Sequence, residues 1–205
     1  GGRDLHAGDP STGVIQPIEE ICALCHKAAV PLHVDATQAV GRIPVDLERV
    51  PIDYLSLSAH KFHGPAGVGA LYAREGASLQ PTLWGGDQEH GLRAGTENLL
   101  GLAGMGCAVK LRQERFSQVQ AEMSLLRDRF ERDLMESVAG VEINGSPQHR
   151  APGISNLRFA GVDGQALVAR LDLLGICSSQ SSACTSARPE PSYVLRAMGL
   201  SEQDS

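Results

Sequence analysis

The chain has 205 residues, of which 42% are hydrophobic, and it carries a formal net charge of −6 at pH 7. This size and composition suit one or two globular domains with a buried core, and the acidic balance argues against nucleic acid as a partner. No apolar run approaches the length of a membrane span, so no membrane association is expected. Five cysteines without framework spacing, and no secretory signal, favour a reducing, cytoplasmic location.

The first half of the chain alternates between strand and helix patterns, which predicts an α/β fold with a largely parallel sheet. Pro17 suits the first position of a helix, so a helix is expected at about 17–29. Strands are expected near residues 31–35, 53–58 and 68–73, followed by a Gly-rich loop around 84–95.

The second half begins with a helical pattern from Thr96, a possible helix cap, to about residue 138. We expect the domain boundary within this long helix, near residue 112. Residues 1–112 would then belong to a large domain and residues 113–205 to a smaller α+β domain. The smaller domain would contain strands at about 141–145 and 154–159 and a helix at about 163–174.

Lys61 stands at the end of an apolar strand, in a turn crowded with Ser, His and Gly. The approach at 52–58 alternates apolar and small polar residues, and the Gly-Pro-Ala-Gly segment at 64–67 then ends it. A partly desolvated ε-amine in such a turn loses its proton more easily and becomes a nucleophile toward carbonyl groups. On spacing alone, a surface lysine beside a hairpin is an equally good interpretation.

Asp35 ends the preceding apolar strand, so it is expected at the same sheet edge as Lys61, where open α/β sheets bind ligands. A carboxylate and an amine that converge there suit pyridoxal 5'-phosphate (PLP), with the lysine as its Schiff-base anchor and the acid at the pyridine nitrogen. Ser58 and His60 could donate hydrogen bonds to its phosphate. The alternatives are a turn or helix cap for Asp35 and ordinary turn residues for Ser58 and His60.

One motif in the first predicted helix suggests a different cofactor, haem. Cys22, Cys25 and His26 have the spacing of the attachment motif for c-type haem and would share one face of the first predicted helix. Haem attachment implies export, and no signal peptide or second ligand is evident. We therefore favour small residues that pack this helix on the sheet.

Four segments together resemble the NifS/IscS-type cysteine desulfurases, in the right order from about Gly13 to the end of the chain. The resemblance implies the class V aminotransferase fold, also called fold-type I of the PLP-dependent enzymes. It combines a mostly parallel sheet in the large domain with part of a smaller α+β C-terminal domain. The four segments are residues 33–41, residues 58–61 with 67–72, residues 85–98 and residues 181–187.

The resemblance also implies individual roles. Lys61 would hold PLP as a Schiff base and later act as base for the substrate α-proton, Asp35 would pair with the pyridine nitrogen, and Gln38 would hydrogen-bond the ring oxygen. Ser58, the Ala59 backbone and His60 would hold the phosphate, and Thr96 would reach the cofactor phosphate of the neighbouring subunit in a homodimer.

Cys184 lies in a segment, residues 178–191, with almost nothing apolar to anchor it, so a mobile surface loop is expected. The resemblance makes Cys184 the nucleophile that takes sulfur from L-cysteine as a persulfide, leaves L-alanine, and passes the sulfur to an acceptor or iron-sulfur scaffold protein. Two alternatives stay open. One is a selenocysteine lyase or another class V PLP enzyme, and the other is a non-catalytic fragment or assembly module.

The chain also departs from this family. Residues 1–12 look unrelated to it and are expected to be disordered or foreign, and Pro10 stands where the family has an asparagine that contacts the cofactor. The chain begins after the family's Gly-Thr phosphate loop and stacking histidine, and it ends before the arginine that binds the substrate carboxylate. We therefore expect the 205-residue chain on its own to be feeble or inactive.

Overall fold

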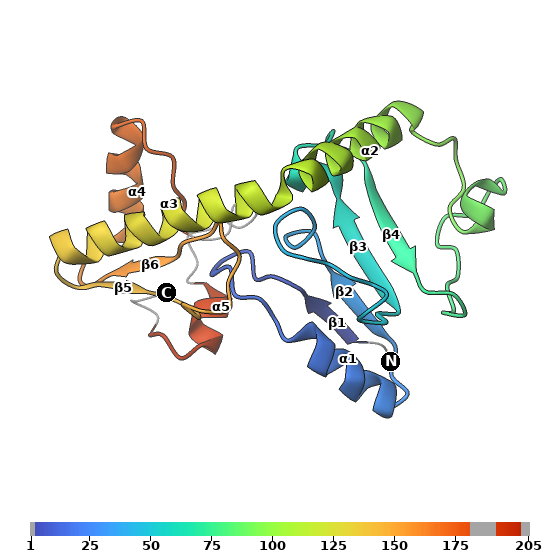
Figure 1. Ribbon diagram of the computed structural model, residues 1–205, viewed down its shortest axis with the longest axis horizontal. Coiled ribbons are helices and arrows are strands. Elements are labelled where there is room, and N and C mark those ends of the chain that lie inside the picture. Colours follow the sequence, from blue (N-terminus) through green and yellow to red (C-terminus); the bar gives the residue numbers. More distant parts are fainter. Residues whose placement is uncertain (1–2, 181–191, 202–205) are drawn as a thin grey trace. The chain divides into compact units, whose positions relative to one another are not determined.

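The computed structural model describes residues 3–180 and 192–201 (Figure 1). The chain forms two compact units. Unit 1 contains the residues up to 8 together with 15–120, and unit 2 contains residues 9–14 together with those from 121 onward. Within the described residues, no helix combines the length and apolar character that a membrane span requires.

Unit 1 is built on a four-stranded sheet in the order β1-β2-β3-β4. The first three strands run parallel, whereas β4 is antiparallel to β3, as the opposed arrows in Figure 1 show. The short turn between β3 and β4 explains this, because a parallel return needs a crossover of a dozen or more residues. The strands are β1 (Arg3–His6), β2 (Leu32–Asp35), β3 (Tyr54–Ser58) and β4 (Gly69–Ala73). The predicted α/β fold with a mostly parallel sheet, and the three predicted strands, are confirmed.

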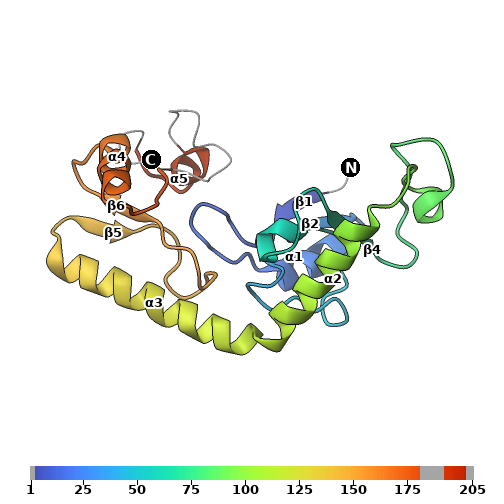
Figure 2. The ribbon, with the colours of Figure 1, turned by 90° about the horizontal axis from the view of Figure 1, so that it is seen from above.

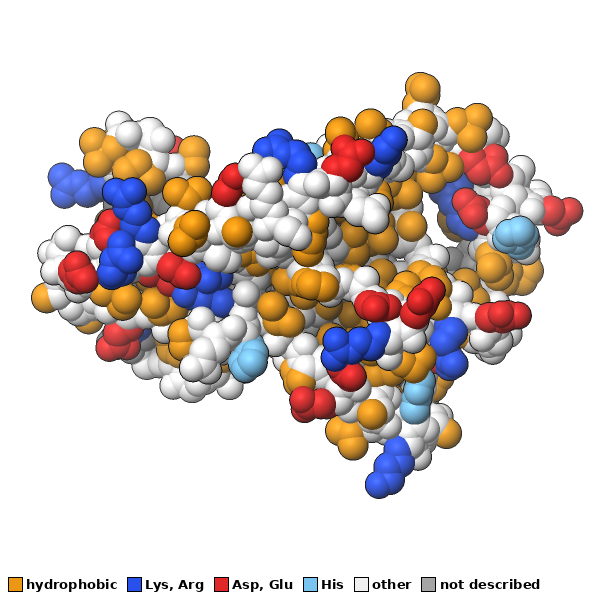
Figure 3. Space-filling view, in the orientation of Figure 1, with side chains coloured by type: hydrophobic (Ala, Val, Ile, Leu, Met, Phe, Trp, Pro, Cys, Tyr) orange, Lys and Arg blue, Asp and Glu red, His pale blue; other side chains and the backbone are white. Residues whose placement is uncertain are grey.

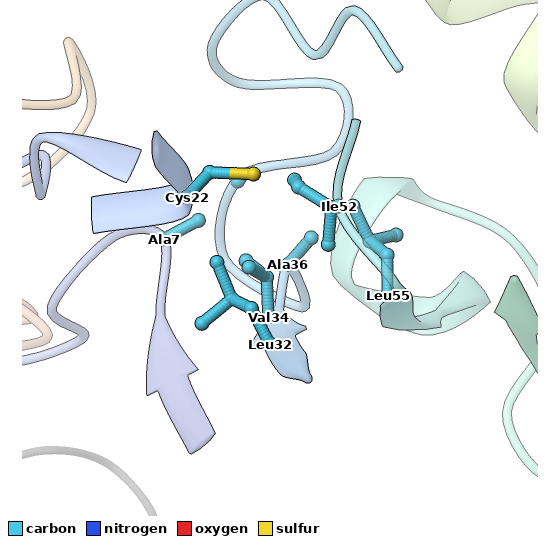
Figure 4. Packing of buried hydrophobic residues seen from close by; sticks show 8 residues of the cluster. Ala7, Cys22, Leu32, Val34, Ala36, Ile52 and Leu55 are labelled. Carbon is cyan, nitrogen blue, oxygen red and sulfur yellow. The ribbon is translucent and has the colours of Figure 1, made fainter. Parts of the chain in front are cut away.

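One face of β2 is apolar and the other is polar, because side chains alternate along a strand. Leu32 and Val34 are almost completely buried, whereas His33 and Asp35 are half-buried. Helix α1 (Ile18–Lys27), close to the predicted range, packs on the apolar side through Cys22. Figure 4 shows this core, whose buried members are Ala7, Cys22, Leu32, Val34, Ala36, Ala39, Ile52 and Leu55.

Cys22 is a core residue, as the packing interpretation of the Cys-Ala-Leu-Cys-His motif expects. Its side chain is 2% exposed, and its thiol donates to the Pro51 carbonyl oxygen at an S–O distance of 3.5 Å. Burial raises the pKa of this thiol, and the nearby Asp53 carboxylate and Cys25 raise it further. Cys22 therefore stays a neutral packing group at ordinary pH.

Two short helices and α2 complete unit 1. The 3-10 helix η1 (Ala59–Phe62) follows β3 directly, and η2 (Gln88–Gly91) lies in the Gly-rich region. Helix α2 (Leu99–Glu114) begins after Asn98, whose side-chain oxygen accepts a hydrogen bond from the Gly101 N–H at 3.0 Å. The expected cap Thr96 is two residues too early, because a capping side chain must stand directly before the first helical residue.

Unit 2 contains most of α3 (Phe116–Ser137) and a two-stranded antiparallel sheet of β5 (Val141–Ile143) and β6 (Leu157–Phe159). Both strands lie beside α3 in the two ribbon views (Figures 1 and 2). Asp163 caps α4 (Gly164–Leu173), and Ser192 caps α5 (Tyr193–Ala197). Charged side chains gather around α3 (Figure 3), where exposed pairs such as Arg129 with Asp133 contribute little stability.

The two compact units divide at residues 120/121, and the domain boundary expected near residue 112 stays a prediction. Arg112 Nε donates to the Gly41 carbonyl at 2.6 Å, and the Gln120 side chain donates to the Arg42 carbonyl. These contacts keep the start of α3 with unit 1.

Most of residues 1–12, which were expected to be disordered or foreign, belong to the described part of the chain. From Arg3 onward they have a defined place in both units. Residues 3–6 form β1, and the Ala7 N–H extends its pairing with β2 by donating to the Asp35 carbonyl at 2.9 Å. In unit 2, Thr12 is 1% exposed, and Ser11 accepts a hydrogen bond from the Asn156 side chain at 3.0 Å.

Asp53 joins four elements of unit 1. Its carboxylate accepts a hydrogen bond from the Leu32 N–H at the start of β2 (2.9 Å), pairs with Arg74 after β4, and lies 3.8 Å from His26 Nε2 of α1. Desolvation raises the pKa of this carboxyl, but the hydrogen bonds from Leu32 and Arg74 and the two cationic side chains together outweigh it. The folded-state pKa of Asp53 is therefore lower than usual.

We expect Asp53→Asn to lower the free energy of unfolding by about 1–3 kcal/mol near neutral pH, because it leaves the Arg74 charge unpaired. The lowered pKa means that the carboxylate stabilises the fold above the unfolded-state value of about 4, and that this contribution is lost as the pH falls through the folded-state pKa. The difference between wild type and variant in urea denaturation should therefore shrink as the pH falls from neutral into the acid range, below the ordinary carboxyl value of about 4. Asp172→Asn, at an exposed position, is the matched control. An equal difference at neutral and acid pH would contradict this account.

Unit 2 contains a buried ion pair between α3 and the segment after β5. Arg150 Nη1 donates to Glu131 Oε1 at 2.6 Å, its Nη2 pairs with the second carboxylate oxygen, and Ser155 Oγ donates to Oε1 at 2.7 Å. The arginine and glutamate side chains are 4% and 3% exposed. A paired charge in such a site is tolerated, but one left alone is costly.

Glu131→Gln should therefore destabilise the fold by about 3 kcal/mol, since it leaves the buried Arg150 with only the distant, exposed carboxylate of Asp128, at 3.9 Å, as an ion-pair partner among the described residues. Glu136→Gln, at an exposed position of the same helix, should change little. Chemical denaturation followed by circular dichroism compares the two. Equal midpoints for the two variants would refute the importance of the buried pair.

Candidate active site

The candidate site lies in unit 1, at the carboxyl ends of the parallel strands β2 and β3. Asp35 is the register partner of Ser56, and the Ala36 N–H donates to the Ser56 carbonyl at 2.9 Å. Ser58 and the helix η1 follow two residues later along β3. The sheet therefore brings Asp35 and the segment 58–61 to the same edge, as the sequence predicts.

The Asp35 carboxylate is contacted at both oxygens. Oδ1 accepts a hydrogen bond from the Thr37 N–H at 2.8 Å, and Oδ2 lies 3.4 Å from His6 Nδ1. The side chain is still 33% exposed. The carboxylate is thus oriented by the protein while keeping access to a bound molecule.

Gln38 stands in the turn after β2 and is half-buried. Its Oε1 atom is buried and has no hydrogen-bond partner among the described residues. A buried amide oxygen without a partner is costly in a protein interior. Because the two ends of an amide exchange on rotation, this unused position suits either a donor or an acceptor on a ligand.

Of the groups expected to hold a phosphate, two side chains are available to a ligand and one backbone N–H is not. Ser58 Oγ and His60 Nδ1 are 2.9 Å apart, and His60 is exposed. Ala59 is completely buried, and its N–H donates to the Val68 carbonyl at 3.0 Å. The two side chains are therefore open to a ligand, whereas the Ala59 N–H is used within the fold and positions its neighbours.

Lys61 is half-buried on η1, between well-anchored neighbours. Ala59 and Phe62, 0% and 2% exposed, form a second apolar cluster with Ala108 of α2. They fix the backbone on both sides of the lysine, while its side chain keeps partial access to solvent. Lys61 is therefore carried by a rigid turn, which suits a nucleophile or base that must be held in place.

The turn after η1 is packed too closely for larger residues. A Cβ on Gly64 would lie 2.9 Å from Ala59 Cβ, and a Cβ on Gly104 of α2 would lie 2.5 Å from Pro65 Cγ. Helix α2 thus supports the turn through a glycine. This close approach holds the lysine-bearing segment against the helix.

The remaining predicted site residues are Thr96 and Cys184. Thr96 is exposed in the segment between η2 and α2, where the neighbouring Gly95 N–H donates to Gln88 Oε1 at 3.1 Å. Its action on a neighbouring subunit stays a prediction. Cys184 lies outside the described residues, so its role as the sulfur acceptor also stays a prediction.

His6 is the residue at this edge that the sequence did not reveal. It belongs to β1, a four-residue strand with no apolar alternation, and only its register beside Asp35 shows its position. Among residues 3–180 and 192–201, no group of three or more His, Cys, Asp or Glu side chains is arranged to hold a metal ion.

The chain matches the family described as aminotransferase class V over residues 5–201. A cysteine desulfurase of Gluconacetobacter diazotrophicus is 44% identical over 187 residues, which cover 91% of this chain and 47% of that protein. The chain thus spans about half the length of the curated relatives it matches.

Solved structures agree with the family match. A NifS-like protein from Rickettsia africae has a TM-score of 0.88 at 31% identity, over 98% of this chain and 53% of that one. SspA, solved in complex with cysteine, has a TM-score of 0.78 at 33% identity, over 98% and 55% of the two chains. By its sequence over residues 5–201 and by its fold, the chain belongs to the class V aminotransferase family.

Proposed function

We propose that this chain supplies the cofactor-anchoring lysine and the sulfur-accepting cysteine of a PLP-dependent cysteine desulfurase. The observation that carries the proposal is the meeting of Asp35, Gln38 and the Lys61 segment at one edge of the parallel sheet. The 44% identity to a relative named cysteine desulfurase, and the likeness to a structure in complex with cysteine, support the choice of substrate.

The residues present fit PLP, on which class V aminotransferases generally depend. The cofactor offers an aldehyde, a pyridine nitrogen, a ring oxygen and a phosphate. The sheet edge offers an amine on Lys61, a carboxylate on Asp35 and hydrogen-bonding groups on Ser58 and His60. The unpartnered end of the Gln38 amide is the specific sign, because the amide nitrogen, rotated to that position, would donate a hydrogen bond to the ring oxygen.

When bound, PLP withdraws electrons from the substrate α-carbon and so weakens the bonds around it. Asp35, oriented by Thr37, would keep the proton on the pyridine nitrogen by charge pairing. Ser58 and His60 would donate hydrogen bonds to the phosphate. Lys61, on η1, would take the α-proton of the substrate at Nζ and return it.

The sulfur transfer needs no external oxidant or reductant, because the sulfur is oxidised as the carbon it leaves is reduced. The Cys184 thiolate attacks the sulfur of L-cysteine, the sulfur–sulfur bond forms as the carbon–sulfur bond breaks, and the carbon left behind takes up a proton. The products are L-alanine and a Cys184 persulfide. L-cysteine and Cys184 each contribute one sulfur atom, and both atoms end in the persulfide on the enzyme.

The proposal includes a sulfur acceptor, a cellular compartment and an oligomeric state. The persulfide would pass its sulfur to an acceptor or scaffold protein for iron-sulfur cluster assembly, in the cytoplasm. The protein would act as a homodimer, in which the exposed Thr96 reaches the partner's cofactor.

Lys61 should be the attachment point of PLP in the protein that contains this chain. Borohydride reduction after loading with PLP should leave the cofactor on the peptide with Lys61, as peptide mass mapping would show. Lys61→Ala should abolish this label, whereas Lys110→Ala, at an exposed site on α2, should retain it. A label on another lysine would remove the central residue of the proposal.

Cys184→Ser should still bind PLP and L-cysteine but release no sulfide in the presence of a thiol reductant, because serine cannot accept the sulfur. Cys177→Ser changes an exposed cysteine of the described chain and should leave sulfide release at the wild-type rate. The rates of sulfide release by the two variants show whether Cys184 accepts the sulfur. Normal sulfide output from Cys184→Ser would transfer the role to another residue.

A further inference from the structure

We infer that His6 is a positioning residue, which holds the Asp35 carboxylate in the orientation that pairs with the pyridine nitrogen of PLP. The inference rests on the proposed function and adds to it a residue from β1. His6 acts through Asp35 and is not assigned contact with the substrate.

The backbone places the two side chains together. His6 and Asp35 are direct register partners in the parallel pair β1-β2, and the Ala7 N–H fixes this register by donating to the Asp35 carbonyl at 2.9 Å. Register partners on neighbouring strands point to the same face of a sheet. His6 Nδ1 accordingly lies 3.4 Å from Asp35 Oδ2.

The contact with His6 completes the support of the carboxylate. The Thr37 N–H holds only Oδ1, and a carboxylate held at one oxygen can still turn about its last bond. With His6 at Oδ2, both oxygens have a partner and the plane of the group is set. A carboxylate fixed in this way loses less entropy when it pairs with a ligand.

Packing does not explain His6. Its side chain is 62% exposed, whereas the apolar core lies on the Leu32 and Val34 face of the sheet. A side chain this exposed contributes little to the folding energy. Its ion-pair partner is the predicted cofactor-binding carboxylate of Asp35, which indicates a role at the site.

The test measures PLP affinity in the protein that contains this chain, by absorbance titration, together with the thermal unfolding midpoint without cofactor. His6→Ala should weaken PLP binding about tenfold, because the Asp35 carboxylate loses its polar contact at Oδ2. His6→Asn, which keeps a short N–H donor, should recover part of the loss. His149→Ala, an exposed histidine of unit 2, is the control and should bind like wild type.

A double-mutant cycle with Asp35→Asn separates positioning from an independent contact. If His6 acts through Asp35, His6→Ala should add little to the loss caused by Asp35→Asn. Additive losses, wild-type affinity in His6→Ala, or a fall in its unfolding midpoint that accounts for the loss would each overturn the inference and leave the proposed function standing. Failure of the wild-type protein to bind PLP would overturn both.

Discussion

The parallel pairing of β1, β2 and β3 is the constraint on which the site depends. Because the three strands end at one edge, residues that are far apart in sequence arrive together there: His6, Asp35 and the segment that carries Lys61. A shift of one residue in either ladder would turn Asp35 to the apolar face. The chemistry is thus set by backbone register, and the fully buried Leu32 and Val34 enforce that register from the opposite face.

Much of this could be predicted from the sequence, because strands that end in a reactive side chain leave a clear pattern. Asp35 and Lys61 were found in this way, and β2, β3 and β4 were placed to within about a residue or two. Strand β1 could not be predicted from the sequence, because its four residues lack apolar alternation and are held mainly by the ladder with β2. His6 could not be found without that strand.

Other features depend on contacts across long stretches of sequence, which no local pattern records. Arg112 and Gln120 donate to backbone carbonyls about 70 to 80 residues away, and these bonds move the division between the units along the helical region. The amide of Gln38 could be assigned to the cofactor only by resemblance. Its buried oxygen without a partner is a property of the folded chain.

The Asp53 carboxylate lies at the edge of the sheet opposite the site, since its partners are the first residue of β2 and an arginine just beyond the end of β4. The sheet therefore keeps the acid-sensitive Asp53 carboxylate away from the candidate site. Asp53 and its partners occupy the amino ends of β2 and β3, and the candidate site residues occupy the carboxyl ends. Substitutions that change the stability of this sheet in acid can thus be made at the edge that does not carry the candidate site.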